Sequence, residues 1–460
     1  MRPRSRTPPT GVHVPELPVP ATVHLPEGRF AMSPRPSRRT LLAGGAGTAL
    51  AGQLLAPGTA AAAPGAARRV VPGADAAARE GWRMLRGRRL GVVSNPTGVL
   101  RDARHIVDSM AEQSGPGALD VVGVFGPEHG FRGSAQAGES EPEFEDPRTG
   151  LTVYDAYGAD AAKLAGLFGD AGVETVVFDI QDVGVRFYTY IWTMYHAMVA
   201  ARSVGARFVV LDRPNPLGRR VDGPLLTEEF ASGVGLKPIV QQHGMTVGEL
   251  ARYFDGELLP HEGEGGSVEP EVVRVRGLDP RATAQQHGLP WVPPSPNMPT
   301  PDTATAYAGT GYFEGTNLSE GRGTTQPFQF IGAPYLDHRY SDRLNALDLP
   351  GVRFREGYFV PTFGDHEGET CAGVQLFVTD PARYRAIPTA VAMLAAARAY
   401  DGFTWRKDAD DKRPYWIDKL SGSSRLRTML DDGAGWERAA AAWRDEVRRF
   451  EQRRRPYLLY

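Results

Sequence analysis

The sequence has almost no cysteine and no excess of either charge. Cys371 is the single cysteine among 460 residues, so an intramolecular disulfide and a cysteine-based metal site are both excluded. We interpret this cysteine as a small core residue. Lysine and arginine number 52 against 54 acidic residues, which gives a net charge of -2. This balance offers no electrostatic argument for nucleic acid or an anionic membrane as the main partner.

Motifs of several common enzyme classes are also absent. The chain has no Walker loop and no G-x-G-x-x-G, so nucleotide binding by the usual phosphate cradles lacks support. It has no G-x-S-x-G elbow, which argues against a serine hydrolase. No H-x-x-x-H pair occurs either. A mixed metal site from His129, Asp179 and Asp182 is conceivable, but their spacing does not demand one, and we predict neither a metal nor a cofactor.

Residues 1–70 lack the pattern of a globular domain and resemble a disordered export leader. The segment SRRTLL at 37–42 precedes a weakly apolar run to Leu55 and a zone of small residues up to Ala67. This order predicts a twin-arginine-type signal, and therefore an exported protein of the cell envelope or the extracellular space. The apolar run is too short and too rich in glycine for stable membrane insertion. A disordered basic tail is the alternative.

From about Arg88 the chain alternates strands with helices. The predicted strands are 89–94, 119–125, 175–180 and 208–212, and the predicted helices between them are 101–113, 160–168 and 192–204. This alternation is typical of βαβ units, so we expect an α/β fold with a parallel sheet. After about Gly332 the pattern predicts a smaller α+β unit, with a strand at 373–378 and helices at 389–400 and 436–451.

Each of the four predicted strands runs into a polar, turn-rich loop. The loops are residues 94–98, 126–133, 178–190 and 212–218. Ligands of open α/β sheets bind outside the carboxyl ends of the strands, so four such loops predict a site at that edge. The third loop places Asp179, Asp182 and Arg186 at or just past a buried strand, where charges must be paired or do chemistry. Helix capping and simple ion pairing are the alternative for this stretch.

A second region rich in polar residues follows at 289–325. Its glycine-rich part holds Glu314, Glu320 and Arg322. Glycoside hydrolysis requires two carboxyl groups beside the scissile bond, one of them protonated. Aromatic rings pack against sugars, and arginine is the natural partner of a substrate carboxylate. The excess of loop carboxylates with aromatic and arginine neighbours therefore indicates an acid-catalysed hydrolase of a polar ligand.

The motifs of these loops, in their order along the chain, resemble the NamZ family of exo-β-N-acetylmuramidases (glycoside hydrolase family 171, formerly a domain of unknown function). The resemblance extends from about Arg88 to the C-terminus. The motifs are GPEHGFRG (126–133), TGLTVYDAYG (149–158), FDIQDVGVRFYTY (178–190), LDRPNPLG (211–218), DGPLL (222–226), HGMTVGELA (243–251), LPWVPPSPNMPT (289–300) and FEGTNLSEGRGTTQPF (313–328).

The resemblance implies a Rossmann-like catalytic domain without a nucleotide, residues 71–305, and a smaller C-terminal α+β auxiliary domain, residues 306–460, that contributes to the active-site cleft. It also implies release of terminal MurNAc from the non-reducing ends of peptidoglycan fragments, in turnover or recycling of the cell wall. The expected partners are saccharides that carry MurNAc.

Roles follow from the same resemblance. Glu128 is our first choice for the general acid, while Asp179, Asp182 and Glu320 compete for the second carboxylate role. The arginines considered for the substrate carboxylate are Arg132, Arg186, Arg213 and Arg322. The other expected substrate ligands are His129, Tyr188, Asn215, Asn297, Glu314 and Asn317.

Two other functions stay open at this point. One is an exported protein that binds muropeptides without cleaving them, and the other is a metal-dependent hydrolase on the same fold. The sequence does not distinguish a retaining, an inverting or an acetamido-assisted mechanism. It also leaves open the oligomeric state, the tolerance of peptide stems and the cleavage point of the leader.

Overall fold

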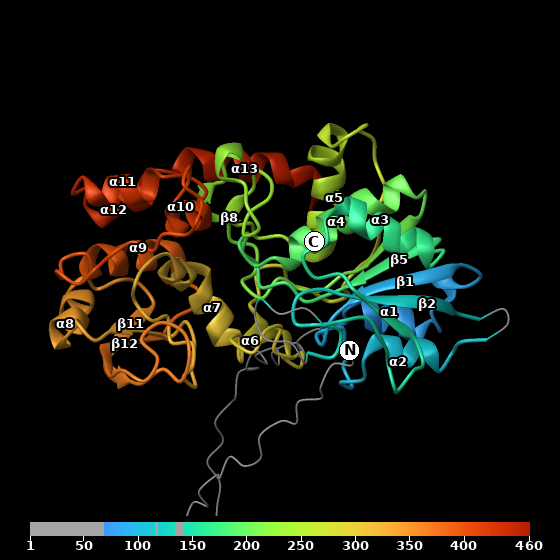
Figure 1. Ribbon diagram of the computed structural model, residues 1–460, viewed down its shortest axis with the longest axis horizontal. Coiled ribbons are helices and arrows are strands. Elements are labelled where there is room, and N and C mark those ends of the chain that lie inside the picture. Colours follow the sequence, from blue (N-terminus) through green and yellow to red (C-terminus); the bar gives the residue numbers. More distant parts are fainter. Residues whose placement is uncertain (1–68, 116–117, 134–137, 139–140) are drawn as a thin grey trace, which may run out of the picture. The chain divides into compact units, whose positions relative to one another are not determined.

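Figure 1 shows the computed structural model of the protein, which describes residues 69–115, 118–133, 138 and 141–460. The predicted export signal lies outside these residues. All described helices and strands belong to one compact unit, Ala66–Tyr460. The expected domain boundary near residue 305 stays a prediction. In the described part of the chain, no helix combines the length and the apolar character needed to cross a membrane.

A mostly parallel sheet organises the N-terminal two thirds of the described chain. Within the described residues it has seven strands in the order β3-β4-β2-β1-β5-β6-β9, and only β3 runs antiparallel to its neighbour. The chain moves from β1 outward to β2 and β4, then returns to β5 on the other side of β1. The topological switch point therefore lies between β1 and β5. The strands are β1 (Arg89–Ser94), β2 (Asp120–Gly126), β3 (Phe144–Glu145), β4 (Thr152–Asp155), β5 (Thr175–Asp179), β6 (Arg207–Leu211) and β9 (Glu271–Val273).

Successive residues of these strands pack into two different cores. In β5, Val176 and Phe178 join the cluster that contains α3, α4 and α5, whereas Val177 joins the cluster on the other face with α1 and α2 (Figure 1). This is the two-residue alternation of a strand covered on both sides. The helices are α1 (Gly73–Arg79), α2 (Ile106–Ala111), α3 (Ala161–Asp170), α4 (Tyr190–Ser203) and α5 (Val247–Glu257).

The C-terminal third contains a small antiparallel sheet in the order β10-β12-β11. Helix α8 packs against β11 and β12, and α7 packs against α9. The same core cluster includes Val183, Val185 and Phe187, which follow β5, so this third packs directly on the loop of the large sheet. The elements are α7 (Pro301–Thr310), η4 (Gly311–Gly315), β10 (Phe330–Ala333), α8 (His338–Ala346), β11 (Val352–Phe359), β12 (Cys371–Val378) and α9 (Ala386–Ala397). The remaining elements with a role below are β7 (Asp222–Leu225), β8 (Val240–Gln242), α6 (Ala284–His287), α10 (Trp416–Ser421), α11 (Arg425–Asp431), α12 (Trp436–Ala441) and α13 (Arg444–Arg454).

The predicted α/β class is confirmed, and the four predicted strands agree with β1, β2, β5 and β6 within one residue at each end. Two helix predictions were wrong in extent. Helix α2 begins only at Ile106, because His105 caps it and residues before it form turns. The helix predicted at 436–451 is divided into α12 and α13, because Trp443 packs in the C-terminal core while Phe450 packs in a core of the large sheet.

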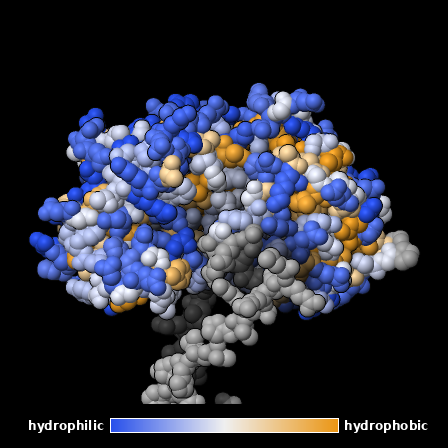
Figure 2. Space-filling view, in the orientation of Figure 1, coloured by the Kyte–Doolittle hydropathy of each residue, from blue (hydrophilic) through white to orange (hydrophobic). Residues whose placement is uncertain are grey.

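The surface drawn in Figure 2 is mainly hydrophilic, with hydrophobic residues in small groups. Cys371 is buried, as expected for a small core residue. Among the described residues, the large hydrophobic side chains that are exposed are Val204, Tyr358, Val360, Phe363 and Phe377.

Candidate active site

Several of the predicted site residues meet in a cleft of about 530 Å³, a volume in the usual range of small-molecule sites. The loops of the large sheet and the C-terminal third both line it. The sheet loops contribute Glu128, His129, residues 156–160 and residues 187–189, and helix α4 contributes Tyr190, Trp192, Thr193 and His196. Further residues from the rest of the chain are Gly233, Val234, Ser295, Tyr307, Glu314, Arg322, Arg406 and Trp416.

Glu128 lies just past β2 in a sharp turn. His129 and Gly130 have left-handed backbones, with φ of 71° and 74°, which reverse the chain at the end of the strand. The Glu128 carboxyl accepts hydrogen bonds from Thr189 Oγ1 and from the backbone N–H of Gly138, both at 3.2 Å. Neither donor is charged, and in the described part of the chain no cation is paired with this carboxyl. Neutral donors therefore orient this carboxyl group at the cleft.

Tyr188 lines the same cleft. Its ring makes edge contacts with Tyr190 and Tyr307, at centroid distances of 5.3 and 5.9 Å. Its hydroxyl is buried and has no hydrogen-bond partner among the described residues. Burial raises the pKa of this phenol well above its ordinary value, so the group stays a neutral donor. A buried hydroxyl without a partner in the wall of a cleft is suited to a ligand atom.

A cluster of charged residues in the C-terminal third consists of Glu314, Glu320 and Arg322. Arg322 Nη2 lies 2.5 Å from Glu314 Oε1, and Arg322 Nε lies 2.7 Å from Glu320 Oε1. Glu314 and Arg322 line the cleft, whereas Glu320 is 5% exposed and lies outside the lining. Burial raises the pKa of Glu320 to about 7, although Arg322 acts in the other direction. Glu128, Asp160 and Glu314 thus bring three carboxyl groups to the cleft, and of these Glu314 comes from the C-terminal third.

Asp179 is fully buried and does not line the cleft. Arg213 holds it in a two-pronged ion pair, with Nε at 2.5 Å from Oδ1 and Nη2 at 2.8 Å from Oδ2. Burial raises the pKa of Asp179, while Arg213 opposes this change. The pair joins the ends of β5 and β6, so the geometry favours a structural role for both residues over the expected roles in catalysis and substrate binding.

Asp182 is buried beside His243. Asp182 Oδ2 accepts a hydrogen bond from the backbone N–H of Gly184 at 2.7 Å and lies 3.2 Å from His243 Nε2. The backbone N–H of Met245 donates to His243 Nδ1, so the imidazole proton is on Nε2 and points at Asp182. This dyad fastens the loop after β5 to the segment after β8. It lies outside the lining of the cleft, which favours a positioning role.

Arg186 and Arg132 are also engaged within the protein. Arg186 is fully buried, and it donates to the backbone carbonyls of Pro224, Ile239 and Leu420 at 2.8 to 2.9 Å. These contacts join β7 and the residue just before β8 to α10. Burial lowers the pKa of Arg186 to about 10. Arg132 forms ion pairs of 2.8 and 2.7 Å with two buried aspartates, Asp108 and Asp146.

The three asparagines expected to bind the substrate lie outside the cleft lining as well. Asn215 donates to the carbonyl of Met245 at 2.9 Å and accepts from the backbone of Leu217. Asn297 is 6% exposed in the proline-rich loop, where its backbone N–H donates to Ser295 Oγ. Asn317 donates to the carbonyl of Gly402 and accepts from the hydroxyl of Tyr335. The side-chain amides of Asn215 and Asn317 therefore shape loops of the two regions.

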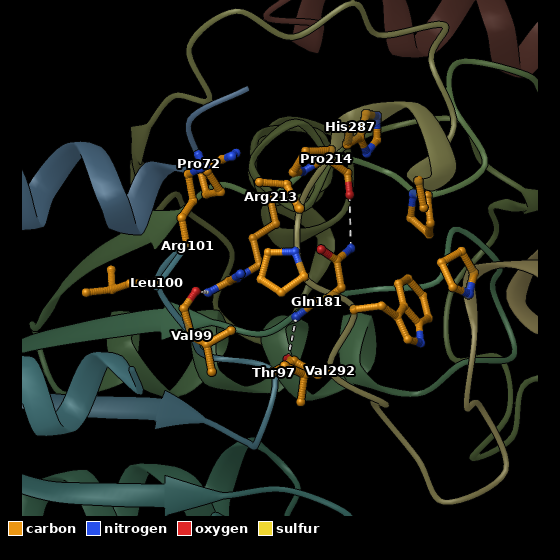
Figure 3. A pocket seen from close by; sticks show the side chains of 16 residues that line it. Pro72, Thr97, Val99, Leu100, Arg101, Gln181, Arg213, Pro214, His287 and Val292 are labelled. Carbon is orange, nitrogen blue, oxygen red and sulfur yellow. Dashed lines mark hydrogen bonds between the residues drawn. The ribbon is translucent and has the colours of Figure 1, made fainter. Parts of the chain in front are cut away.

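A second and much smaller cavity lies at the switch point of the sheet (Figure 3). Its volume is about 40 Å³, which leaves room for only a few water molecules. The hydrogen bonds drawn there join Gln181 to Thr97 and Pro214, and Arg213 to Val99. Protein groups thus occupy the crevice where related sheets bind a ligand.

Residues that the sequence did not single out complete the cleft. Thr189 lies within the motif of 178–190, so its position beside Glu128 had a local signal. Tyr307, Arg406 and Trp416 had none, because they reach the cleft only through packing of the C-terminal third. Within the described residues, no group of three or more His, Cys, Asp or Glu side chains is placed to hold a metal ion.

Comparisons with known proteins match nearly all of the described chain. The N-terminal model of exo-β-N-acetylmuramidase NamZ matches residues 90–302, and its C-terminal model matches residues 305–460. The peptidoglycan β-N-acetylmuramidase NamZ of Bacillus subtilis (strain 168) is 39% identical over 396 residues, which cover 85% of this chain and 92% of the relative.

Two solved structures are similar over the same span. Both are crystal structures of DUF1343 family proteins from Bacteroides fragilis NCTC 9343. One has a TM-score of 0.74 and 30% identity, and the other has a TM-score of 0.66 and 29% identity. Each alignment covers 85% of this chain and 99% of the other. The chain therefore belongs to the exo-β-N-acetylmuramidase NamZ family.

Proposed function

We propose that this protein is a glycoside hydrolase that releases single MurNAc residues from the non-reducing ends of peptidoglycan fragments. The observation that carries the proposal is the cleft in which Glu128, Tyr188 and Glu314 come together. Family membership supports the muramidase activity. Action at chain ends, and a role in turnover or recycling of the cell wall, are parts of the proposal that the experiments below address.

Glu128 is the proposed general acid. Cleavage breaks the bond between the anomeric carbon of MurNAc and the glycosidic oxygen, and the Glu128 proton moves to that oxygen as the bond breaks. The carboxylate that forms keeps the hydrogen bonds from Thr189 and Gly138. A water oxygen finally bonds to the anomeric carbon, and the proton that the water loses restores the acid.

Glu314 is the proposed second carboxyl group. It lines the cleft and is ion-paired with Arg322, a placement that suits a group that stabilises positive charge on the sugar or that acts as nucleophile or base. The acetamido group of the substrate is the competing nucleophile. A substrate with a trifluoroacetamido group separates the two, because the weaker nucleophile slows only the assisted route.

We place this activity outside the cytoplasm. The paired arginines at 37–42 and the small residues up to Ala67 support export by a twin-arginine-type signal. Peptidoglycan lies in that compartment. Sequencing the N-terminus of protein recovered from the cell envelope tests this point, and a chain retained intact in the cytoplasm would contradict it.

The first experiment measures MurNAc release from a defined MurNAc–GlcNAc disaccharide and from the corresponding tetrasaccharide. We expect free MurNAc and a trisaccharide that begins with GlcNAc from the tetrasaccharide, since cleavage at the inner MurNAc–GlcNAc bond would instead yield free GlcNAc and a trisaccharide that keeps its terminal MurNAc. Glu128→Gln should lower kcat by about 10²- to 10⁴-fold, the range of general acid catalysis, without changing the melting temperature. Glu437→Gln, a substitution of an exposed glutamate on α12, is the matched control.

Three results would overturn parts of this proposal. Wild-type turnover by Glu128→Gln would remove Glu128 from the acid role. Disaccharide binding without release by the wild-type protein would favour a muropeptide-binding protein. Release that is lost in EDTA and restored by a divalent cation would favour a metal-dependent hydrolase.

A further inference from the structure

The arginines expected to bind a substrate carboxylate already have partners inside the protein. Each one forms ion pairs with carboxylates or hydrogen bonds with backbone carbonyls, as described above. These residues are Arg132, Arg186, Arg213 and Arg322. Only Arg322 among them lines the cleft, and its guanidinium is shared by Glu314 and Glu320. Binding a further carboxylate there would require one of these ion pairs to break.

Arg406 also lines the cleft, and its surroundings differ from those of the four arginines above. The residue is exposed, and in the described part of the chain no carboxylate is ion-paired with its guanidinium. Its side chain has a single long hydrogen bond within those residues, from Nη1 to the backbone carbonyl of Glu314 at 3.4 Å. A cation at the cleft wall with free N–H donors can bind an anionic group of a ligand without first losing a partner.

The position of Arg406 is nevertheless well defined. Its backbone N–H donates to the carbonyl of Gly315 at 2.9 Å, and its own carbonyl accepts from the backbone N–H of Trp416 at 3.0 Å. The guanidinium carbon lies 5.7 Å from the centroid of the Trp416 ring, which also lines the cleft. A flat guanidinium beside an aromatic ring keeps its plane oriented, which lowers the entropy lost when a ligand binds.

The acidic residues that line the cleft indicate a role for Arg406 in substrate binding. The acidic residues Asp160 and Glu314 line the same space, and a substrate that carries its own carboxylate meets their repulsion. MurNAc differs from GlcNAc by a lactyl ether on O3, which ends in a carboxylate. A guanidinium donates two parallel hydrogen bonds to such a group, and it stays charged at any relevant pH.

We propose that Arg406 binds the lactyl carboxylate of the terminal MurNAc, oriented by Trp416, and thereby selects MurNAc over GlcNAc. This assignment rests on the proposed function. It makes Arg406 a specificity-determining residue, while bond cleavage remains with the carboxyl groups of the cleft. The substrate it favours is a terminal MurNAc whose lactyl group is free and ionised.

The test compares three chromogenic substrates: 4-nitrophenyl β-MurNAc, its lactyl amide and 4-nitrophenyl β-GlcNAc. Arg406→Gln should lower kcat/KM for the free acid by about 10- to 100-fold, mainly through KM, because a charge-assisted contact is lost. The rate with the lactyl amide should stay within about two-fold. Arg406→Lys keeps the charge without the planar fork, so an intermediate loss is expected. Arg449→Gln, a substitution of an exposed arginine on α13, is the control.

Two outcomes overturn the assignment while leaving the proposed function intact. One is an equal loss by Arg406→Gln on the acid and on the amide, and the other is an unchanged rate on the acid. A third arm uses the substrate with L-alanine on the lactyl group, and a loss confined to that substrate would place the contact at a peptide carboxylate. If the wild-type protein cleaves none of the substrates, the proposed function itself fails.

Discussion

The strand-tip network and the cleft contain the same kinds of side chain in opposite states. We use strand-tip network for Asp179, Asp182, Arg186, Arg213 and His243. Every one of these residues is buried and bonded to another part of the protein. In the cleft, by contrast, three groups face one space: a carboxyl with neutral donors, a phenol, and an arginine. The phenol has no hydrogen-bond partner and the arginine no carboxylate partner within the described parts of the chain.

The difference follows from the cost of burying a charge. A buried ion must be neutralised within the fold, so its hydrogen bonds are already made before a ligand arrives. A group that binds or protonates a ligand needs donors or acceptors that are still available. Pairing state therefore distinguishes Glu128, Tyr188 and Arg406 from the strand-tip network, whereas Glu314 and Arg322 are paired with each other within the cleft. A place at the carboxyl edge of a sheet does not make this distinction.

The strand-tip network still serves the cleft. Asp182 and Arg186 hold the loop after β5 at both ends, and Tyr188 and Thr189 follow directly in that loop. A rigid support of this kind keeps site groups within the small tolerances that catalysis requires. We therefore expect its loss to reduce stability first and activity as a consequence.

Asp179→Asn should disrupt the strand-tip network most strongly. It leaves the Arg213 guanidinium buried without a carboxylate, which costs about 3–5 kcal/mol in the free energy of unfolding. Urea denaturation measures this loss. If Asp179→Asn unfolded like the wild type but lost turnover, Asp179 would belong to the catalytic groups instead. The double substitution Asp179→Leu with Arg213→Met should recover part of the stability, because no unpaired charge remains.

The buried Glu320 should give stability a pH dependence that exposed carboxylates lack. Its pKa rises from 4.5 to about 7 on folding, so the folded state holds the proton more tightly. The free energy of unfolding should therefore fall by roughly 1–3 kcal/mol as pH increases from 4.5 to 7, and stay level above that.

Glu320→Gln, which does not titrate, should flatten this part of the curve. Urea denaturation of both proteins at several pH values gives the comparison. Asp212, whose pKa burial raises to about 6, adds a slope of the same sign to both proteins. The difference between the two curves is therefore the quantity to measure, and parallel curves would contradict the assignment to Glu320.

Tyr188→Phe should have the smallest effect on stability. The lost hydroxyl has no partner among the described residues, so the free energy of unfolding should change by less than about 0.5 kcal/mol. The value of kcat/KM for the disaccharide should fall by about 3- to 10-fold, the effect of one neutral hydrogen bond to the ligand. Tyr190→Phe is the matched contrast, because its hydroxyl donates to the carbonyl of Pro294 at 2.6 Å. Tyr190→Phe should therefore lower the free energy of unfolding by about 1 kcal/mol. Equal losses in Tyr188→Phe and Tyr190→Phe would contradict the expected difference between the two hydroxyl groups.

Sequence patterns predicted the strands well because their signals are local. The β-branched run at 175–178 is buried on both faces in the structure, as its composition indicated. The polar turn after β2 likewise pointed to Glu128. The same reasoning ranked Asp179 and Asp182 beside Glu128, since all three follow buried strands. Asp179 and Arg213 are 34 residues apart and pair only when β5 and β6 lie side by side, so no local pattern shows that this carboxylate is neutralised.

The sequence by itself determined the α/β class, the edge of the sheet that carries the loops, and the family to which the motifs point. Only the tertiary structure decided which charges are paired and which face the cleft. It also brought Glu314, Arg406 and Trp416 to the loops of the large sheet. The reason is physical: secondary structure depends on neighbours along the chain, whereas the burial and pairing of a charge depend on partners that folding brings from distant positions.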